Sequence, residues 1–131
     1  MNPIITACTT PLDEPQSWEK NRGREYFWPL RRVEDDLGAY GPGWAGVQLD
    51  CWHFSNSKTF RTSLYPTTVF DNGMTSTEML GLATAPWIKG KAVDRYSAKG
   101  LAAFATEALA EFRAAFTGGH EGIRALFEVT D

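Results

Sequence analysis

An apolar stripe late in the sequence constrains the fold of this 131-residue chain more than any other feature. Between Ser97 and about Phe116, apolar residues recur at the spacing that places them on one face of an α-helix. Ser97 is a suitable N-cap, and Gly118-Gly119 is a suitable end. The stripe consists of Leu101, Phe104, Ala105, Ala108, Leu109, Phe112 and Phe116. A helix with one apolar face must pack on another layer, so the stripe predicts a sheet beneath it.

The segments that precede this helix have the composition of strands. Residues 25–33, 47–54 and 59–65 are rich in aromatic and β-branched side chains, and the polar turn 55–58 makes the last two an antiparallel hairpin. Pro29 cannot donate to a ladder and indicates a sheet edge or a bulge. Strands first and a long helix last predict an α+β fold, with a small antiparallel β-sheet packed against one long C-terminal α-helix, plus short helices.

Several other segments are assigned from local signals. We expect a loop over residues 34–46, a short helix over 76–82, an extended segment over 87–96 and a second short helix near the end of the chain. A chain of this length is predicted to be a single domain, 1–131. Residues 1–24, with three prolines, are predicted to form an irregular N-terminal lead-in.

Composition limits where the protein is expected to occur and what it is expected to bind. Two cysteines, Cys8 and Cys51, allow at most one bridge, which favours a reducing, cytoplasmic location. No run of 18 apolar residues is present, so no membrane span is expected. The net charge of −3 argues against broad binding to nucleic acid.

The charge is unevenly distributed along the chain. Residues 58–99 carry six basic and three acidic side chains, whereas both flanking segments carry a net charge of −3. This pattern fits either neutralisation within the fold or a local patch that faces an anion. The net charge of each segment is only three in magnitude, which favours neutralisation within the fold.

The stretch Val47–Phe54, VQLDCWHF, holds a carboxylate, a thiol and an imidazole within four residues. In a strand, successive side chains point to opposite faces, so Asp50 is predicted to point away from Cys51 and His53. A Cys–His pair without an orienting group lacks the parts of a nucleophilic site. We therefore expect no catalytic residues. No motif has metal-ligand spacing, and no cofactor or metal is expected.

Aromatic residues make up 13% of the chain, and not all of them fit core positions. Trp, Tyr and Arg are the residue types enriched where protein interfaces bind most strongly. Arginines bracket Tyr26 and Trp28 in the sequence. The predicted partner-binding residues are Tyr26, Trp28, Arg31, Arg32, Tyr40, Trp44 and Trp52.

These observations favour a non-enzymatic protein-binding module. We expect an inhibitor of a partner protein, in the general style of immunity proteins or of mobile-element (phage) antagonists, although no motif matches one. One alternative is a small-ligand-binding protein or enzyme with an apolar pocket between sheet and helix, where Cys51, His53 and Tyr65 would be the polar groups. The other is a structural assembly subunit or homodimer that uses either the edge of the sheet or the alanines on the outer side of the long helix, Ala102, Ala103, Ala110 and Ala114.

Overall fold

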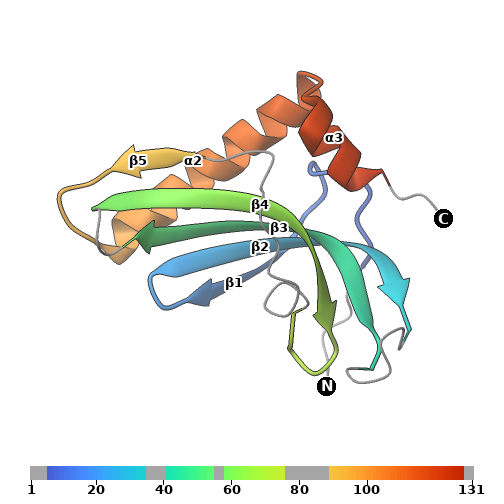
Figure 1. The fold of residues 1–131 in the computed structure, drawn as a ribbon. Coiled ribbons are helices and arrows are strands. Elements are labelled where there is room, and N and C mark those ends of the chain that lie inside the picture. The colour runs from blue at the N-terminus through green and yellow to red at the C-terminus, as the bar shows by residue number, and fades with distance from the viewer. Residues whose placement is uncertain (1–5, 35–40, 55–57, 76–88, 129–131) are drawn as a thin grey trace.

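The structure is a computed structural model that describes residues 6–34, 41–54, 58–75 and 89–128. Five antiparallel strands follow one another in chain order across one sheet, β1-β2-β3-β4-β5, and two helices come after them (Figure 1). The strands are β1 Gln16–Lys20, β2 Gly23–Val33, β3 Gly43–Phe54, β4 Thr59–Phe70 and β5 Gly90–Ala92; the helices are α2 Ala98–Thr117 and α3 Glu121–Phe127. The predicted α+β fold is confirmed.

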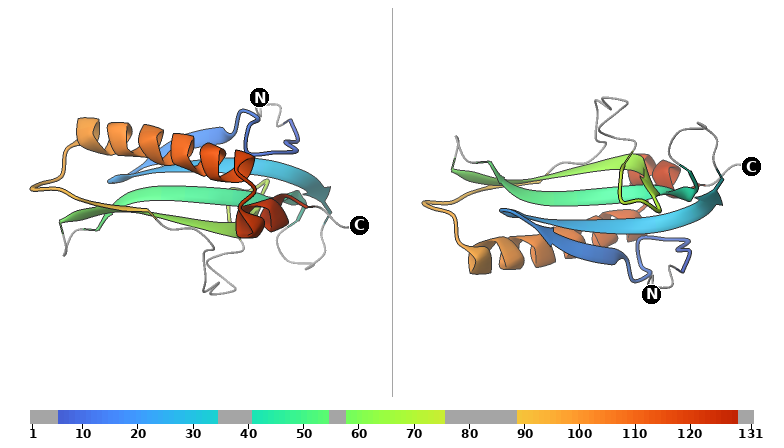
Figure 2. Two further views of the ribbon diagram at one scale, coloured as in Figure 1. Left: turned by 90° about the horizontal axis from the view of Figure 1, so that it is seen from above. Right: turned by 90° about the horizontal axis from the view of Figure 1, so that it is seen from below.

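Helix α2 forms where its stripe and its cap predict it. The Ser97 side chain accepts a hydrogen bond from the backbone N–H of Gly100, and the helix ends before Gly118. Its buried residues are Leu101, Phe104, Ala105, Ala108 and Phe112. Figure 2 shows α2 running across one face of the sheet, so the sheet is the predicted layer on which the stripe packs. None of the described helices is long and apolar enough to cross a membrane.

Two aromatic clusters fill the space between the sheet and the helices. Phe112 and Phe127 pack on Trp28, with ring centroids 5.0 and 5.9 Å from it. Nearer the start of α2, Phe104 packs on Phe60 at 5.3 Å. The side chains of these five residues contribute to one continuous core, which burial of apolar surface stabilises.

Segment 6–15 is held against the core by its backbone carbonyls. The indole N–H of Trp28 donates to the carbonyl oxygen of Asp13 at 3.1 Å. Arg113, on α2, donates to the same oxygen at 3.2 Å and to the carbonyl oxygen of Pro11 at 2.9 Å. These hydrogen bonds tie the beginning of the described chain to its last long helix.

Strands β2, β3 and β4 bend away from the helices at one end (Figure 1). At this bend Pro29 pairs with Gly46, and Pro66 lies beside it opposite Val47. The register of β2 also shifts between Pro29 and Arg31. A bulge and a glycine are the usual devices for bending strands, so the bulge predicted at Pro29 is confirmed.

Some predicted boundaries are wrong. Strand β1 lies inside the predicted irregular lead-in 1–24, and β3 begins at Gly43, inside the predicted loop 34–46. Strand β4 continues through Pro66 to Phe70, and β5 is only three residues of the extended segment expected over 87–96. The short helix predicted over 76–82 lies outside the described residues.

Candidate functional site

Strand alternation divides the side chains of the sheet between two faces. We call the face covered by α2 and α3 the helix face and the opposite one the far face. The register of the strands places the following residues on the far face: Trp18, Glu25, Phe27, Arg32, Trp44, Gln48, Asp50, Trp52 and Tyr65.

A polar cluster lies at the centre of the far face. The side-chain amide of Gln48 donates to the carboxylates of both Glu25 and Asp50, the latter at 2.7 Å, and to the Tyr65 hydroxyl oxygen at 3.1 Å. The Tyr65 hydroxyl donates to the second oxygen of Asp50. The Nζ of Lys20 lies 2.6 Å from the remaining oxygen of Glu25. Four strands, β1 to β4, supply these five side chains, so the cluster fixes their relative register.

Burial sets the electrostatics of this cluster. Desolvation raises the pKa of Asp50, although hydrogen bonds from Tyr65 and Gln48 oppose the rise. Desolvation, with the neighbouring Asp50 charge, also raises the pKa of Tyr65. Each oxygen of the Glu25 and Asp50 carboxylates already accepts a hydrogen bond or an ion pair. The cluster therefore acts as a rigid polar support for the face rather than as a pair of reactive acids.

Three tryptophans surround this cluster, and each is partly exposed. Trp18, on β1, packs on buried Phe27 with ring centroids 6.5 Å apart. Trp44 and Trp52 lie on the same strand, eight residues apart, which is about 26 Å at the usual rise of a strand. None of the three belongs to the buried core, and together they span the far face.

The guanidinium of Arg32 is held in place at one end of this face. It donates two hydrogen bonds to Asp71, at 2.8 and 2.6 Å, and lies 5.6 Å from the ring centroid of Trp44. A bidentate pair fixes both the position and the plane of an arginine side chain. The hydrogen bonds raise the pKa of Arg32 and lower the pKa of Asp71. An Arg–Trp pair in one fixed geometry is therefore presented near the bend.

Two of the predicted partner-binding residues are instead core residues. Trp28 has no exposed surface, and Tyr26 is only 8% exposed. Both point to the helix face, because their partners in the register are Val47 and Leu49 of the core. Their aromatic character serves packing under α2 and α3, so the prediction that they contact a partner is wrong.

The other predicted contact residues do not all lie together. Arg32, Trp44 and Trp52 share the far face, as the prediction requires. Arg31 is exposed but pairs with Ala45, so it points to the opposite side from its neighbour Arg32. Tyr40 lies outside the described residues. Trp18, on the same face, is not among the predicted contact residues, and it lies on β1 within the segment predicted to be irregular.

The thiol, imidazole and carboxylate of VQLDCWHF are divided as predicted. Cys51 lies in the core on the helix face, while Asp50 bonds Gln48 and Tyr65 on the far face. Burial raises the pKa of the Cys51 thiol to about 12, so it carries almost no thiolate at neutral pH. His53 packs against the rings of Phe60 and Tyr96. The residues do not form a nucleophilic site.

The polar pocket predicted from Cys51, His53 and Tyr65 does not form. Tyr65 pairs with Gln48 and points to the far face, away from the other two. Fully buried side chains, among them Trp28, Phe104 and Phe112, fill the space between the described strands and helices. The alanines on the outer side of α2, Ala102, Ala103, Ala110 and Ala114, are exposed, and their use in assembly stays a prediction.

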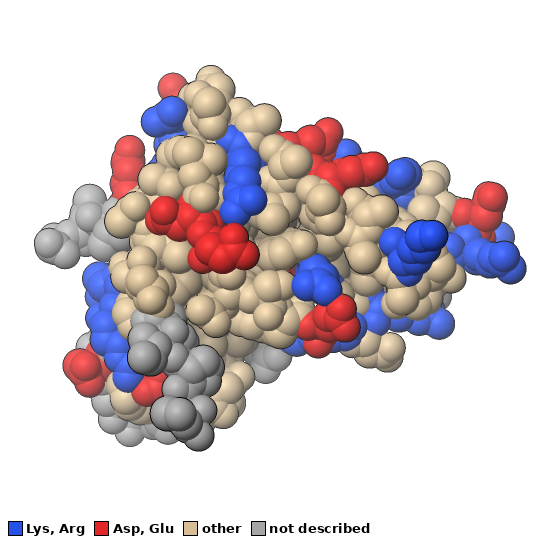
Figure 3. Space-filling model, turned by 180° about the vertical axis from the view of Figure 1, so that it is seen from behind, with Lys and Arg blue, Asp and Glu red and all other residues tan. Residues whose placement is uncertain are grey.

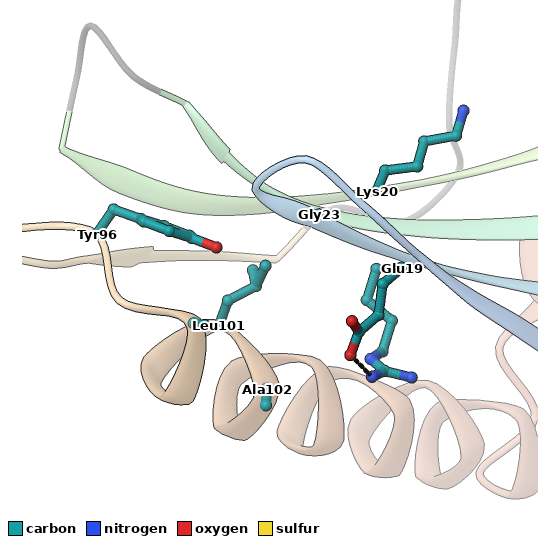
Figure 4. A pocket seen from close by; sticks show the side chains of 8 residues that line it. Glu19, Lys20, Gly23, Tyr96, Leu101 and Ala102 are labelled. Atoms are coloured by element: carbon teal, nitrogen blue, oxygen red, sulfur yellow. Dashed lines mark hydrogen bonds and ion pairs between the residues drawn. The ribbon is translucent and has the colours of Figure 1, made fainter.

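Two hollows flank the β1–β2 hairpin. One lies on the far face beside Lys20, Glu25, Asp50 and Trp52. The other lies between the hairpin and the start of α2, where the Tyr96 ring points into it and Glu19 reaches toward the helix to pair with Arg24 (Figure 4). Lys20 points the other way, toward the far face. The hairpin thus separates two hollows, both of which contain charged groups.

Within the described ranges, no three His, Cys, Asp or Glu residues are grouped so as to hold a metal ion. Comparison with known proteins finds no family model, curated protein or solved structure that matches this chain.

Proposed function

We propose that this protein is a non-enzymatic binding module that inhibits or neutralises a partner protein, and that it binds this partner through the far face. The observation that carries the proposal is the placement of Trp18, Trp44 and Trp52 on one side of the sheet, outside the core and partly exposed. Partly exposed tryptophans on a rigid surface are the most effective contact residues in protein interfaces.

Rigidity supports the same proposal. The polar cluster links four strands beneath the tryptophans, and Asp71 fixes Arg32 beside Trp44. A surface that is already ordered loses little conformational entropy on binding, which favours affinity. The alternative of a ligand pocket between sheet and helix has no such support, because core side chains fill that space.

The test is a pull-down from the native host, followed by affinity measurement with the captured protein. Trp44→Ala and Trp52→Ala should each weaken binding at least tenfold, since each removes a large contact side chain from the far face. Leu12→Ala is the matched control: it removes a 55% exposed apolar side chain from the N-terminal segment and should leave binding unchanged.

Thermal melts of all three variants must show an intact fold before binding is compared. If both tryptophan variants retain the partner at wild-type affinity, the far face is not the binding surface. If only Leu12→Ala weakens binding, the partner contacts the N-terminal segment instead.

A further inference from the structure

The basic residues of this acidic chain are concentrated at one end of the molecule. Segments 19–24, 58–61 and 89–99 together carry nine basic and two acidic residues, while the rest of the chain carries four basic and fourteen acidic residues. The sequence pattern revealed only part of this asymmetry, since 19–24 is distant in the chain from the other two segments. The segments meet through the sheet and at the start of α2.

Specific contacts join the three segments. The N–H of His53 donates to the Arg22 carbonyl oxygen at 2.9 Å, which places the β1–β2 turn beside the end of β3. The N–H of Val93 donates to the Lys58 carbonyl oxygen, also at 2.9 Å. The Arg22 guanidinium lies 5.2 Å from the ring centroid of Tyr96, just before α2. Figure 3, seen from behind, shows Lys and Arg side chains gathered at this end of the molecule, on the right.

Four of the nine cations are neutralised within the fold. Ion pairs join Lys20 to Glu25, Arg24 to Glu19, Lys89 to Glu111 and Lys91 to Glu107. Another four are exposed and form no ion pair with any described residue: Arg22, Lys58, Arg95 and Lys99. We call these four residues the basic end. They come from both hairpin turns, the segment before α2 and its first turn.

Local backbone preferences oppose three of these four residues. Arg22 and Lys58 have φ values of 59° and 52°, in the left-handed region that favours glycine or asparagine. Lys99 lies in the first turn of α2, where the helix dipole favours acidic side chains and none is present. Apart from the contact of Arg22 with Tyr96, neither the turns nor the dipole of α2 gains stability from these charges, which indicates a role outside the fold.

We infer that the basic end binds an acidic surface of the partner protein and steers the two molecules together. This inference rests on the proposed function, and the geometry connects the two surfaces: Trp52, on the far face, pairs with Arg61 of segment 58–61. Exposed cations that no ion pair neutralises increase the rate of association with an oppositely charged surface. Four cations grouped at one end fit the carboxylates of an acidic protein surface better than they fit single-stranded nucleic acid, which binds in a basic groove that follows its backbone and stacks on aromatic side chains.

Fluorescence anisotropy with two labelled probes of similar charge tests the inference. One is a peptide of about twelve glutamates, and the other is a single-stranded DNA of about twelve nucleotides. The peptide should bind the wild-type protein at low salt, more tightly than the DNA does, and should dissociate as salt is raised. The double variant Arg22→Gln/Lys58→Gln should weaken peptide binding at least tenfold.

The matched control is Arg31→Gln/Arg124→Gln, which removes the same charge from exposed positions away from the basic end and should change affinity less than twofold. Equal weakening by both double variants, or no peptide binding by the wild type, would overturn the inference. Tighter binding of the DNA would also overturn it and assign the basic end to nucleic acid. None of these outcomes bears on the Trp44 and Trp52 variants, so the two proposals can fail separately.

Discussion

At the scale of single residues, the side of the sheet on which a residue lies determines its role. Cys51 and Asp50 are adjacent in sequence, yet one lies in the core and the other in a hydrogen-bonded cluster on the opposite face. Burial raises the pKa of both side chains. Alkylation of Cys51 therefore tests the burial of the helix face, and the pH dependence of stability through Asp50 tests the burial of the far face.

Alkylation should show that Cys51 is chemically inert in the folded protein. Because burial raises its pKa to about 12, its reaction with iodoacetamide at neutral pH should be at least about a hundredfold slower than in denaturing urea. Mass spectrometry of the peptide that contains Cys51 measures both rates. Comparable rates in the two conditions would show that the thiol is accessible, and Cys51 would again be a candidate nucleophile.

Asp50 should make the folded state less stable as pH rises. Its pKa is raised on folding, so the folded state binds its proton more tightly than the unfolded state does. The free energy of unfolding of the wild type should therefore fall, relative to that of Asp50→Asn, as pH rises from about 3.8 through the raised pKa. Urea denaturation of both proteins between pH 3 and 8 measures the difference, which should level off above that range.

Asp13→Asn is the control of opposite sign. Hydrogen bonds from the backbone N–H groups of Thr9 and Thr10 lower the pKa of Asp13. Its contribution to stability is therefore present above about 3.8 and lost as pH falls through the lowered pKa. If Asp50→Asn and Asp13→Asn shift the pH profile in the same direction, desolvation does not dominate at Asp50.

At the scale of elements, the sheet depends on a close approach at its bend. A Cβ at Gly46 would lie 2.0 Å from the carbonyl oxygen of Trp28 and 3.0 Å from the Phe27 ring. Only a residue without a side chain lets β2 and β3 pair here while Phe27 packs across the position. The pairing of β3 with β2 therefore requires glycine at position 46, and this glycine does not mark a loop.

Gly46→Ala should destabilise the protein by about 3 kcal/mol or more, because the new methyl group collides with backbone that cannot move without breaking the strand pairing. Gly90→Ala, in β5, is the control: its nearest neighbouring atom would be 3.8 Å away, and the change should be within about 0.5 kcal/mol. Urea denaturation measures both. Equal effects of the two substitutions would contradict this account of the bend.

The strands and helices also show which elements can be predicted from the sequence and which cannot. Periodicity predicts α2, its cap at Ser97 and the β3–β4 hairpin. It fails at Gly43–Gly46, because glycines that permit close strand packing resemble those of a loop. The predicted strand 59–65 stops before Pro66, which has no N–H to donate to a ladder. Strand β4 nevertheless continues through Pro66, because β5 pairs with β4 only at residues 59–61 and requires no donor there.

The candidate site was predictable only in part. Alternation places Tyr26 and Trp28 on one side of β2, but periodicity alone does not say which side meets the helix. The hairpin register could have revealed the polar cluster, since a turn at 55–58 places Gln48 directly opposite Tyr65. Glu25 joins them only through the β2–β3 pairing, whose register is set by the bulge rather than by a short turn.

At the scale of the whole molecule, charge is segregated although the net value is only −3. Two hairpin turns and the start of α2 place Arg22, Lys58, Arg95 and Lys99 at one end. The segregation follows from topology, because alternate turns of a meander lie at the same end of the strands. The net charge alone, which argues against broad binding to nucleic acid, therefore gives an incomplete description of the surface.

Ion-exchange chromatography should detect this segregation directly. At pH 7 and low salt the wild type should be retained on a sulfonate resin despite its negative net charge, because the basic end binds locally. Arg22→Gln/Lys58→Gln should elute at clearly lower salt than Arg31→Gln/Arg124→Gln, although the two variants have the same net charge. Passage of the wild type through the column without retention would contradict the segregation.

The anchoring of segment 6–15 by Trp28 and Arg113 has a consequence for biosynthesis. Arg113 is translated about a hundred residues after the carbonyls to which it donates, and every strand leaves the ribosome before α2 does. Until that helix emerges, the nascent meander must hold Trp28, Leu49 and Leu64 without their covering layer, a state prone to self-association and suited to chaperone capture. Completion of the core thus waits for the translation of both α2 and α3, and a ribosome stalled before them would expose the apolar face of the sheet.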